Sequence, residues 1–258
     1  MLGLMRQTIR FSLVCALLAC AQAAAAAKTP APLARSRQLV VVTTRGWDEV
    51  PGVLRRFERK GAKGAWAQVG RDVPVVVGRN GLGWGAGLLD LDGGSGVSKK
   101  EGDGRAPAGV FAFGTAFGFE QSRAAWLRLP YTPLKPSTEC VDDTRSRRYN
   151  LIVDRLAAGD VDWNSSEKMR SVEGYRWGLV VRHNAQPPVA GRGSCIFLHI
   201  WAGPGKGTAG CTAMEEENLR DLLRWLDPKT RPLLVQLPEA EYARLRAAWQ
   251  LPALNPEK

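Results

Sequence analysis

The feature that most constrains the fold is a series of short β-type segments between residues 38 and 200. Each segment is rich in β-branched or aromatic residues and is followed by a turn rich in Gly, Pro or Asp. We expect strands at residues 38–44, 65–69, 73–77, 109–113, 149–153, 175–182 and 195–200. A chain with so many short, regularly interrupted strands is predicted to have a β-dominated core.

Helices are expected to flank this core. Residues 51–60 place Val53, Leu54 and Phe57 among charged residues, which predicts a short amphipathic helix. The other expected elements are a helix over 212–226 that ends at Asp227–Pro228, a strand at 232–237 and a final helix at 239–250. The predicted fold class is therefore mostly β with flanking helices.

The first 27 residues have the character of an export signal. Arg6 and Arg10 precede an apolar run over 11–19, and an Ala-rich stretch follows. The apolar run is short for a hydrocarbon layer of about 30 Å, so we expect residues 1–27 to be removed as a signal peptide. In the alternative reading Leu17–Cys20 is a lipobox, and lipidation of Cys20 tethers the protein to a membrane.

The rest of the chain is predicted to form one domain. A length of 258 residues allows one domain of about 200 residues, and 45% hydrophobic residues with nine Trp supply the apolar surface for its core. The expected divisions are a linker at 28–37, a single domain at 38–250 and a tail at 251–258.

The chain is strongly basic, with a formal net charge of +11. Such a surface favours polyanions. We expect no nucleic-acid partner, because the sequence has no helix-turn-helix, zinc-finger or aromatic-interleaved basic motif and the leader directs it outward. Anionic envelope polymers and lipid headgroups are the expected partners. In the alternative, the surface is basic but binds none of them.

Three cysteines remain once the leader is removed: Cys140, Cys195 and Cys211. In an oxidising compartment two thiols tend to pair and the third is reactive or buried. We hypothesise a Cys140–Cys195 disulfide that leaves Cys211 free. No metal is expected, because two His without a C-x-x-C pair give too few ligands. No cofactor is expected either, because no convincing helix follows the glycine run at 81–86, as dinucleotide binding requires, and the run at 203–208 is best interpreted as a turn.

The candidate chemistry involves His199, at the end of a predicted strand, and Cys211, which follows after a glycine-rich loop. Thr212–Glu215 matches a capping box, which places Cys211 at a helix N-terminus where the thiol pKa is lowered. We expect Cys211 as nucleophile and His199 as general base, with the free N–H groups of the helix N-terminus able to hold an oxyanion and Gly210 leaving room for the substrate. In the alternative, both side chains are buried structural residues.

The same segments resemble the YkuD-type L,D-transpeptidases of bacterial peptidoglycan. Residues 100–111 resemble the family's Lys…Thr-Pro-x-Gly-x-[FY] segment, Phe-Leu-His199 its Ile-His-Gly strand and Gly-Thr-Ala-Gly-Cys211 its Ser-His-Gly-Cys loop. The resemblance spans about residues 38–237 and implies a β-sandwich-like catalytic domain. It also implies Cys211 as nucleophile, His199 as base and the backbone N–H groups of Gly210 and Cys211 as the oxyanion hole.

The sequence departs from that pattern beside both residues. Ile200 replaces the glycine after the histidine, Ala209 replaces the histidine before Gly-Cys, and Ala213 stands where an arginine often follows. Substrate contacts are therefore expected partly elsewhere. The candidates are Trp201, Thr208, Ala209, His183 and Ser166. For His183 and for the 162–169 segment that contains Ser166, a strand-end hydrogen bond and a surface loop are the open alternatives.

As the resemblance implies, the thiolate attacks a peptidoglycan stem peptide, expels its terminal D-amino acid and forms a thioester. Attack by an amine then gives 3-3 cross-links or exchanges the D-amino acid, and attack by water makes the enzyme an L,D-carboxypeptidase. Cleavage of another envelope amide is a related alternative. A non-catalytic cell-wall-binding module is the alternative of a different class. In every case the expected location is the periplasm or cell envelope.

Overall fold

The computed structural model describes residues 29–61, 64–89, 96–185 and 187–254. The predicted signal peptide and Cys20 lie outside these residues. Most of the described strands belong to one ten-stranded sheet. Its strands are β1 (Gln38–Thr44), β2 (Pro51–Glu58), β3 (Ala67–Val76), β4 (Leu82–Trp84), β5 (Ala106–Gly118), β6 (Tyr131–Pro133), β10 (Trp177–Val181), β11 (Phe197–Ile200), β12 (Thr212–Met214) and β13 (Leu233–Pro238).

This large sheet curls until its ends meet. The strand path is β10-β11-β12-β3-β2-β1-β13-β5-β4, and β5 also pairs with β10, so the path returns to its start. Closure leaves few unpaired strand edges and encloses one apolar core. Val41, Phe111 and Leu198 are fully buried in that core. The fold is mostly β with flanking helices, as the sequence predicts.

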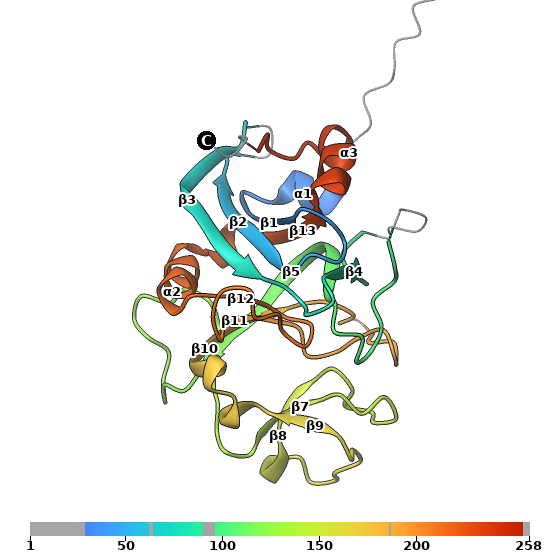
Figure 1. Cartoon of the computed structure of the whole chain (residues 1–258). Helices are drawn as coiled ribbons and strands as arrows, with labels where there is room; N and C mark the ends of the chain where they lie inside the picture. The colour runs from blue at the N-terminus through green and yellow to red at the C-terminus, as the bar shows by residue number, and fades with distance from the viewer. Residues whose placement is uncertain (1–28, 62–63, 90–95, 186, 255–258) are drawn as a thin grey trace, which may run out of the picture.

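The helices lie on the outside of the large sheet (Figure 1). They are α1 (Ala31–Arg35), α2 (Glu216–Trp225) and α3 (Glu239–Trp249). The α2 helix packs beside β10 and β11 through buried leucines, and α3 packs beside β1 and β13. The expected linker thus contains α1, whose Leu33 is buried, and Leu251 in the expected tail is buried as well. No helix in the described part of the chain is long and apolar enough to cross a membrane.

The helix predicted over 51–60 is wrong, because residues 51–58 form strand β2. This strand pairs with β1 on one side and β3 on the other. Both of its faces are covered: Leu54 is buried on one face, and Arg55 and Phe57 are buried on the other. Because both faces are buried, β2 lacks the alternation of apolar and polar residues by which a strand is recognised. The spacing of its apolar residues therefore resembled that of a helix. The two strands expected at 65–69 and 73–77 are likewise one strand, β3.

A small three-stranded sheet lies below the large sheet in Figure 1. Its strands are β7 (Thr138–Val141), β8 (Ile152–Asp154) and β9 (Ser166–Lys168), in the order β8-β7-β9. The disulfide hypothesised from the sequence is present: Cys140 in β7 is bonded to Cys195, just before β11. The small sheet is thus covalently attached beside the strand that carries His199.

Candidate active site

The pairing of β11 with β12 brings the two predicted catalytic residues together. These strands are parallel, and His199 lies opposite Ala213. Side chains alternate along a strand, so Cys211, two residues before Ala213, projects from the same face as His199. Both side chains lie near Tyr175: its ring centroid is 5.2 Å from that of His199, and Cys211 packs in the same buried cluster as Tyr175.

The expected position of Cys211 at a helix N-terminus is wrong. Thr212–Met214 form strand β12, which pairs with β11 and β3, and α2 begins only at Glu216. The Thr212 hydroxyl donates to Gln236 Oε1 at 2.7 Å and caps no helix. Sheet pairing on both sides satisfies the backbone of this segment and overrides the local capping signal.

Without the helix, the thiol of Cys211 is not activated in the way expected. Cys211 is 7% exposed and packs in an apolar cluster with Phe117, Tyr175 and Phe197. Burial, and then the negative charge of Glu167, raise the pKa of the Cys211 thiol to about 12. The Phe197 N–H, which donates to Sγ at 3.3 Å, opposes this shift only in part. At rest the Cys211 side chain is therefore a neutral thiol.

His199 is held in the tautomer that a general base needs. Its Nδ1 lies 2.8 Å from the backbone oxygen of Ile200, so Nδ1 carries the proton and donates it to that carbonyl. Nε2 then keeps its lone pair. Burial lowers the pKa of His199 to about 4, which keeps the ring neutral at physiological pH. Among the described residues, however, no hydrogen bond joins His199 directly to Cys211.

Glu167 is a residue of the site that the sequence analysis missed. The Tyr175 hydroxyl donates to Glu167 Oε2 at 2.8 Å. Burial, together with the negative charge of Asp142, raises the pKa of Glu167, and the hydrogen bond from Tyr175 offsets part of this. The side chain comes from β9, where Glu167 lies opposite Cys140. Glu167 and the disulfide therefore face the large sheet from the same side of the small one.

Ser166, predicted as a substrate contact, faces the opposite way. Its hydroxyl donates to Glu139 Oε2 at 2.7 Å, and Trp163 Nε1 donates to the same oxygen. Glu139 also pairs with Lys168 and Arg155. Adjacent residues of a strand point to opposite faces, so Ser166 lies on the face of β9 opposite to Glu167, and its contact with a substrate stays a prediction. Only the pairing register of β7 with β9 shows that Glu167, and not Ser166, is directed towards Cys211.

Thr208 organises the loop before Cys211. Its hydroxyl donates to the Cys211 backbone oxygen at 2.7 Å and accepts the Gly210 N–H at 3.1 Å. Gly210 has little room for a side chain, because an added Cβ would lie 3.1 Å from the backbone oxygen of Arg105. The Gly210 N–H, predicted as an oxyanion-hole donor, is thus already engaged by Thr208. The role of the Cys211 N–H stays a prediction.

A buried ammonium group lies next to this loop. Lys99 is 5% exposed, and its Nζ donates to Asp103 Oδ1 at 2.7 Å and to the Lys100 backbone oxygen at 2.8 Å. Its charge lowers the pKa of the Cys211 thiol, although less than burial raises it. Lys100, the first residue of the segment that resembles the family pattern, is exposed, whereas its neighbour Lys99 is buried beside the loop.

The other predicted substrate contacts are distributed around the site. His183 is buried against Phe111, its Nε2 lies 2.9 Å from the Arg192 backbone oxygen, and burial lowers its pKa to about 4. This is the strand-end hydrogen bond that was the open alternative. Trp201 follows β11, with its backbone N–H bonded to Met214, and Ala209 is exposed in the loop before Cys211. Their contact with a substrate stays a prediction.

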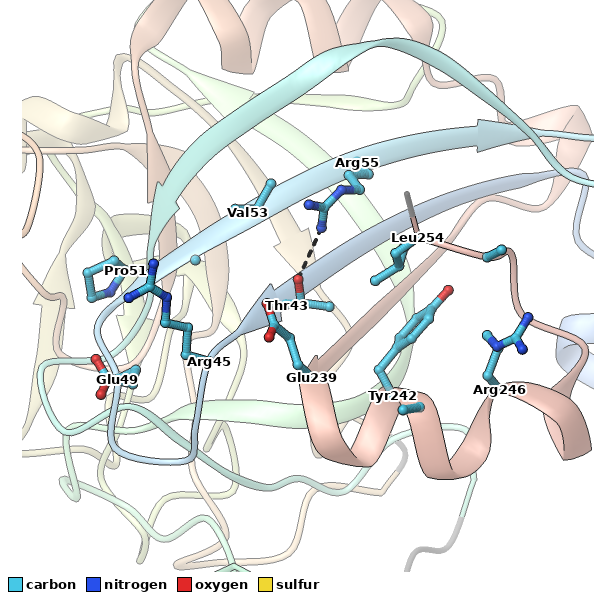
Figure 2. Close-up of a pocket in the computed structure, with 13 residues that line it drawn as sticks. Thr43, Arg45, Glu49, Pro51, Val53, Arg55, Glu239, Tyr242, Arg246 and Leu254 are labelled. Carbon is cyan, nitrogen blue, oxygen red and sulfur yellow. Dashed lines mark hydrogen bonds between the residues drawn. The ribbon is translucent and has the colours of Figure 1, made fainter. Parts of the chain in front are cut away.

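A cavity of about 920 Å³ lies away from this site, between α3 and strands β1 and β2 (Figure 2). Figure 2 shows Tyr242 between Glu239 and Arg246 on α3, facing Arg55 on β2. Arg55 is already paired with Asp72 and Thr43. Positive and negative side chains both line the cavity, and neither Cys211 nor His199 does. The sequence offered no indication of this cavity.

Among the described residues, no group of three or more His, Cys, Asp or Glu side chains is arranged to hold a metal ion. The side chains gathered around Cys211 are a thiol, an imidazole, a phenol and a carboxylate. Together they can transfer a proton and provide a nucleophile, and acyl transfer through cysteine requires both.

Comparison with known proteins agrees with this chemistry. The family model for the YkuD L,D-transpeptidase catalytic domain matches residues 60–235, a range that contains Cys211, His199, Tyr175 and the whole small sheet. No curated protein and no solved structure matches the chain. The match covers more than half of the sequence, and the chain therefore belongs to the YkuD family of L,D-transpeptidase catalytic domains.

Proposed function

We propose that the protein is a cysteine-dependent L,D-transpeptidase that acts on peptidoglycan stem peptides through a thioester at Cys211. The observation that carries this proposal is the β11–β12 register, which puts Cys211 and His199 on one face of the sheet. The hydrogen bond from His199 Nδ1 to Ile200 supports it, because it leaves Nε2 free to accept a proton.

The reaction has two steps, and in each step one acyl bond forms while another breaks. Sγ attacks the carbonyl carbon of the third stem residue, the thiol proton is transferred to a base, and the terminal D-amino acid leaves as an amine that takes up a proton. An amine then attacks the thioester, the C–S bond breaks, and the proton lost by the amine returns to the sulfur. The amine of a second stem peptide gives a 3-3 cross-link, and a free D-amino acid exchanges the terminal residue.

The test is incubation of the mature protein with disaccharide-tetrapeptide muropeptides, followed by mass spectrometry beside a Cys211→Ala variant. Dimers that depend on Cys211 support transpeptidation. Tripeptide without dimers identifies an L,D-carboxypeptidase that uses the same residues with water as acceptor. If neither forms but a carbapenem acylates Cys211, the machinery acts on another envelope amide.

A second candidate is a non-catalytic cell-wall-binding module that keeps the fold. The burial of Cys211 and the raised pKa of its thiol favour this candidate. It predicts binding to purified peptidoglycan sacculi, no muropeptide product and no carbapenem adduct. Acylation of Cys211 by a carbapenem would exclude it.

We also propose that the protein functions in the periplasm or cell envelope. The Cys140–Cys195 disulfide supports this location, because structural disulfides persist in oxidising compartments. Peptidoglycan and anionic envelope polymers are the proposed partners there. Fractionation followed by N-terminal sequencing tests the location and the removal of residues 1–27, and a lipid adduct on Cys20 would instead show membrane anchoring.

A further inference from the structure

We propose that the buried ammonium of Lys99 forms part of an anion site beside Cys211, where its charge stabilises the oxyanion that develops during acyl transfer. This inference rests on the proposed function for the identity of the natural acyl donor. The effect of the charge on a reaction of Cys211 can be tested without that donor.

The Lys99 side chain lies against two backbone segments that contact or adjoin Cys211. A Cβ added to Gly210, the residue before Cys211, would lie 3.8 Å from Lys99 Nζ. A Cβ added to Gly193 would lie 3.0 Å from Lys99 Cε. Two residues after Gly193, the backbone oxygen of Cys195 accepts a hydrogen bond from the Cys211 thiol at 3.5 Å. The backbone on both segments thus approaches the lysine closely, and the ammonium is fixed beside the loop that carries Cys211.

The Lys99 ammonium has an N–H donor that the fold does not use. A lysine side chain has three N–H donors and no acceptor. Asp103 Oδ1 accepts one at 2.7 Å and the Lys100 backbone oxygen accepts another at 2.8 Å, while nothing in the described part of the chain accepts the third. The Asp103 carboxylate also accepts the backbone N–H groups of Lys100 and Arg105, so it does not serve Lys99 alone.

A positive group is needed at Cys211 because the features expected to hold an oxyanion there are missing or engaged. Thr212–Met214 form strand β12, so no helix N-terminus is present, and the Gly210 N–H donates to Thr208. Three Lys or Arg side chains are buried among the described residues: Arg55, Arg59 and Lys99. The two arginines lie in β2 or directly after it. Of the three, only Lys99 is buried beside the Cys211 loop.

Burial makes this charge effective. The Lys99 side chain is 3% exposed, so water and salt screen its charge much less than that of a surface lysine. Burial raises the pKa of the Cys211 thiol, the negative charge of Glu167 raises it further, and the Lys99 charge lowers it. A fixed cation that attracts a thiolate also attracts an oxyanion formed next to the sulfur.

The ammonium contributes charge alone, and the acylation balances without a proton from it. As Sγ bonds to the carbonyl carbon, the thiol proton moves to His199, the proposed base, and the C=O electron pair moves onto oxygen, where Lys99 attracts it. As the C=O bond re-forms, the C–N bond breaks and the leaving amine takes up the proton from His199. Lys99 keeps its own protons throughout.

The test compares two alkylating reagents that differ in charge. Iodoacetate and iodoacetamide have nearly the same shape, but iodoacetate carries a carboxylate on the carbon that Sγ attacks, so it places a negative charge close to the position of the oxyanion. The rates of Cys211 alkylation by both reagents are followed by intact mass of the mature protein. Their ratio reports the charge at this position, because a change in the accessibility of the thiol affects both rates.

Two neutral variants remove the ammonium in different ways. Lys99→Met keeps the length of the side chain, and Lys99→Gln keeps an N–H donor; Lys99→Arg restores the charge. Lys100→Met is the matched control, because it removes the same charge from the adjacent, exposed side chain and leaves the backbone hydrogen bonds of Lys100 in place.

The ratio of the iodoacetate rate to the iodoacetamide rate is expected to fall about tenfold in both neutral variants, the lower end of what one opposite charge contributes at short range. Lys99→Arg stays within about threefold of the parent and Lys100→Met within about twofold, because water screens an exposed charge. In the muropeptide assay Lys99→Met lowers kcat and changes KM little, since the oxyanion exists only in and around the transition state.

Two results would overturn the inference. A ratio within about twofold of the parent in both neutral variants would mean that Lys99 only holds its own loop in place. An equal fall in Lys100→Met would mean that the basic surface as a whole attracts the anionic reagent. The muropeptide products are read separately: a fall in the ratio without products supports the anion site and rejects the proposed substrate, and products with an unchanged ratio do the reverse.

Discussion

The large sheet and the small sheet are held together by different physical means. The large sheet closes on itself around an apolar core, in which Val41 and Leu198 are fully buried. The small sheet is held by a disulfide on one face and, on the other, by the buried carboxylate of Glu139 with its hydrogen bonds and ion pairs. Cys211 thus comes from a region stabilised by the hydrophobic effect, and Glu167 from one stabilised by groups that respond to oxidation and to pH.

The sharpest way to test this difference is to remove the disulfide. Replacement of Cys140 and Cys195 by Ser opens a loop whose ends are 55 residues apart in sequence, and chain entropy predicts a loss of about 4 kcal/mol in the free energy of unfolding. Denaturant unfolding without reductant measures it. Hydrogen exchange should show faster opening in β7 and β9 than in β1 and β13. A loss below about 1 kcal/mol would mean that the small sheet does not depend on this bond.

Truncation of a buried side chain in the large sheet is expected to cause the next largest loss in the free energy of unfolding. Leu198→Ala removes a fully buried side chain from β11 and should lower the free energy of unfolding by about 3 kcal/mol. Leu156→Ala beside the small sheet is the matched control, because Leu156 is 87% exposed and its loss should stay within about 0.5 kcal/mol. Equal losses in the free energy of unfolding for the two variants would contradict the conclusion that the large sheet, unlike the small one, is stabilised by its apolar core.

The polar face of the small sheet should be sensitive to acid. Burial alone would raise the pKa of Glu139, but hydrogen bonds from Lys168, Ser166 and Trp163 outweigh it and lower the pKa to about 2. A depressed pKa in the folded state stabilises the fold above the ordinary value of 4.5, and this stabilisation is lost as the pH falls from there towards about 2. Hydrogen exchange against pH should therefore show β7–β9 opening before β1 and β13.

A variant isolates the contribution of this carboxylate. Glu139→Gln should lower the free energy of unfolding by about 2 kcal/mol, the scale of hydrogen bonds to a charged group, and should remove the acid dependence in β7–β9. If the acid dependence of β7–β9 persists in Glu139→Gln, another carboxylate is responsible.

The smallest predicted effect is in the loop before the nucleophile. Thr208→Val keeps the shape of the side chain and removes the hydroxyl that joins Gly210 to Cys211, which should cost about 1 kcal/mol and slow the alkylation of Cys211. Thr115→Val is the control, because its hydroxyl bonds to Ala116 in β5, away from the loop. A Cys211 rate that does not differ between the two variants would show that Thr208 does not position the nucleophile.

Sequence analysis was most successful where the signals are local. Runs of β-branched residues between turns identified β1, β5, β10, β11 and β13 to within a few residues, or in part for the long β5. His199 and Cys211 were chosen because one ends a strand and the other follows a glycine-rich loop, and the structure places them on one face of the sheet. The analysis failed at β2 and at Thr212–Met214, where pairing with distant strands overrides the local pattern.

The sequence by itself determined a mostly β chain with a free cysteine close to a histidine, because strand propensity, turn residues and the number of cysteines are properties of short segments. Only the tertiary structure decided that Glu167 and not Ser166 faces Cys211, that Lys99 and not Lys100 is buried beside it, and that the thiol lies in a strand pair without a helix dipole. The physical reason is that these outcomes depend on strand register, which contacts between residues far apart in the chain establish.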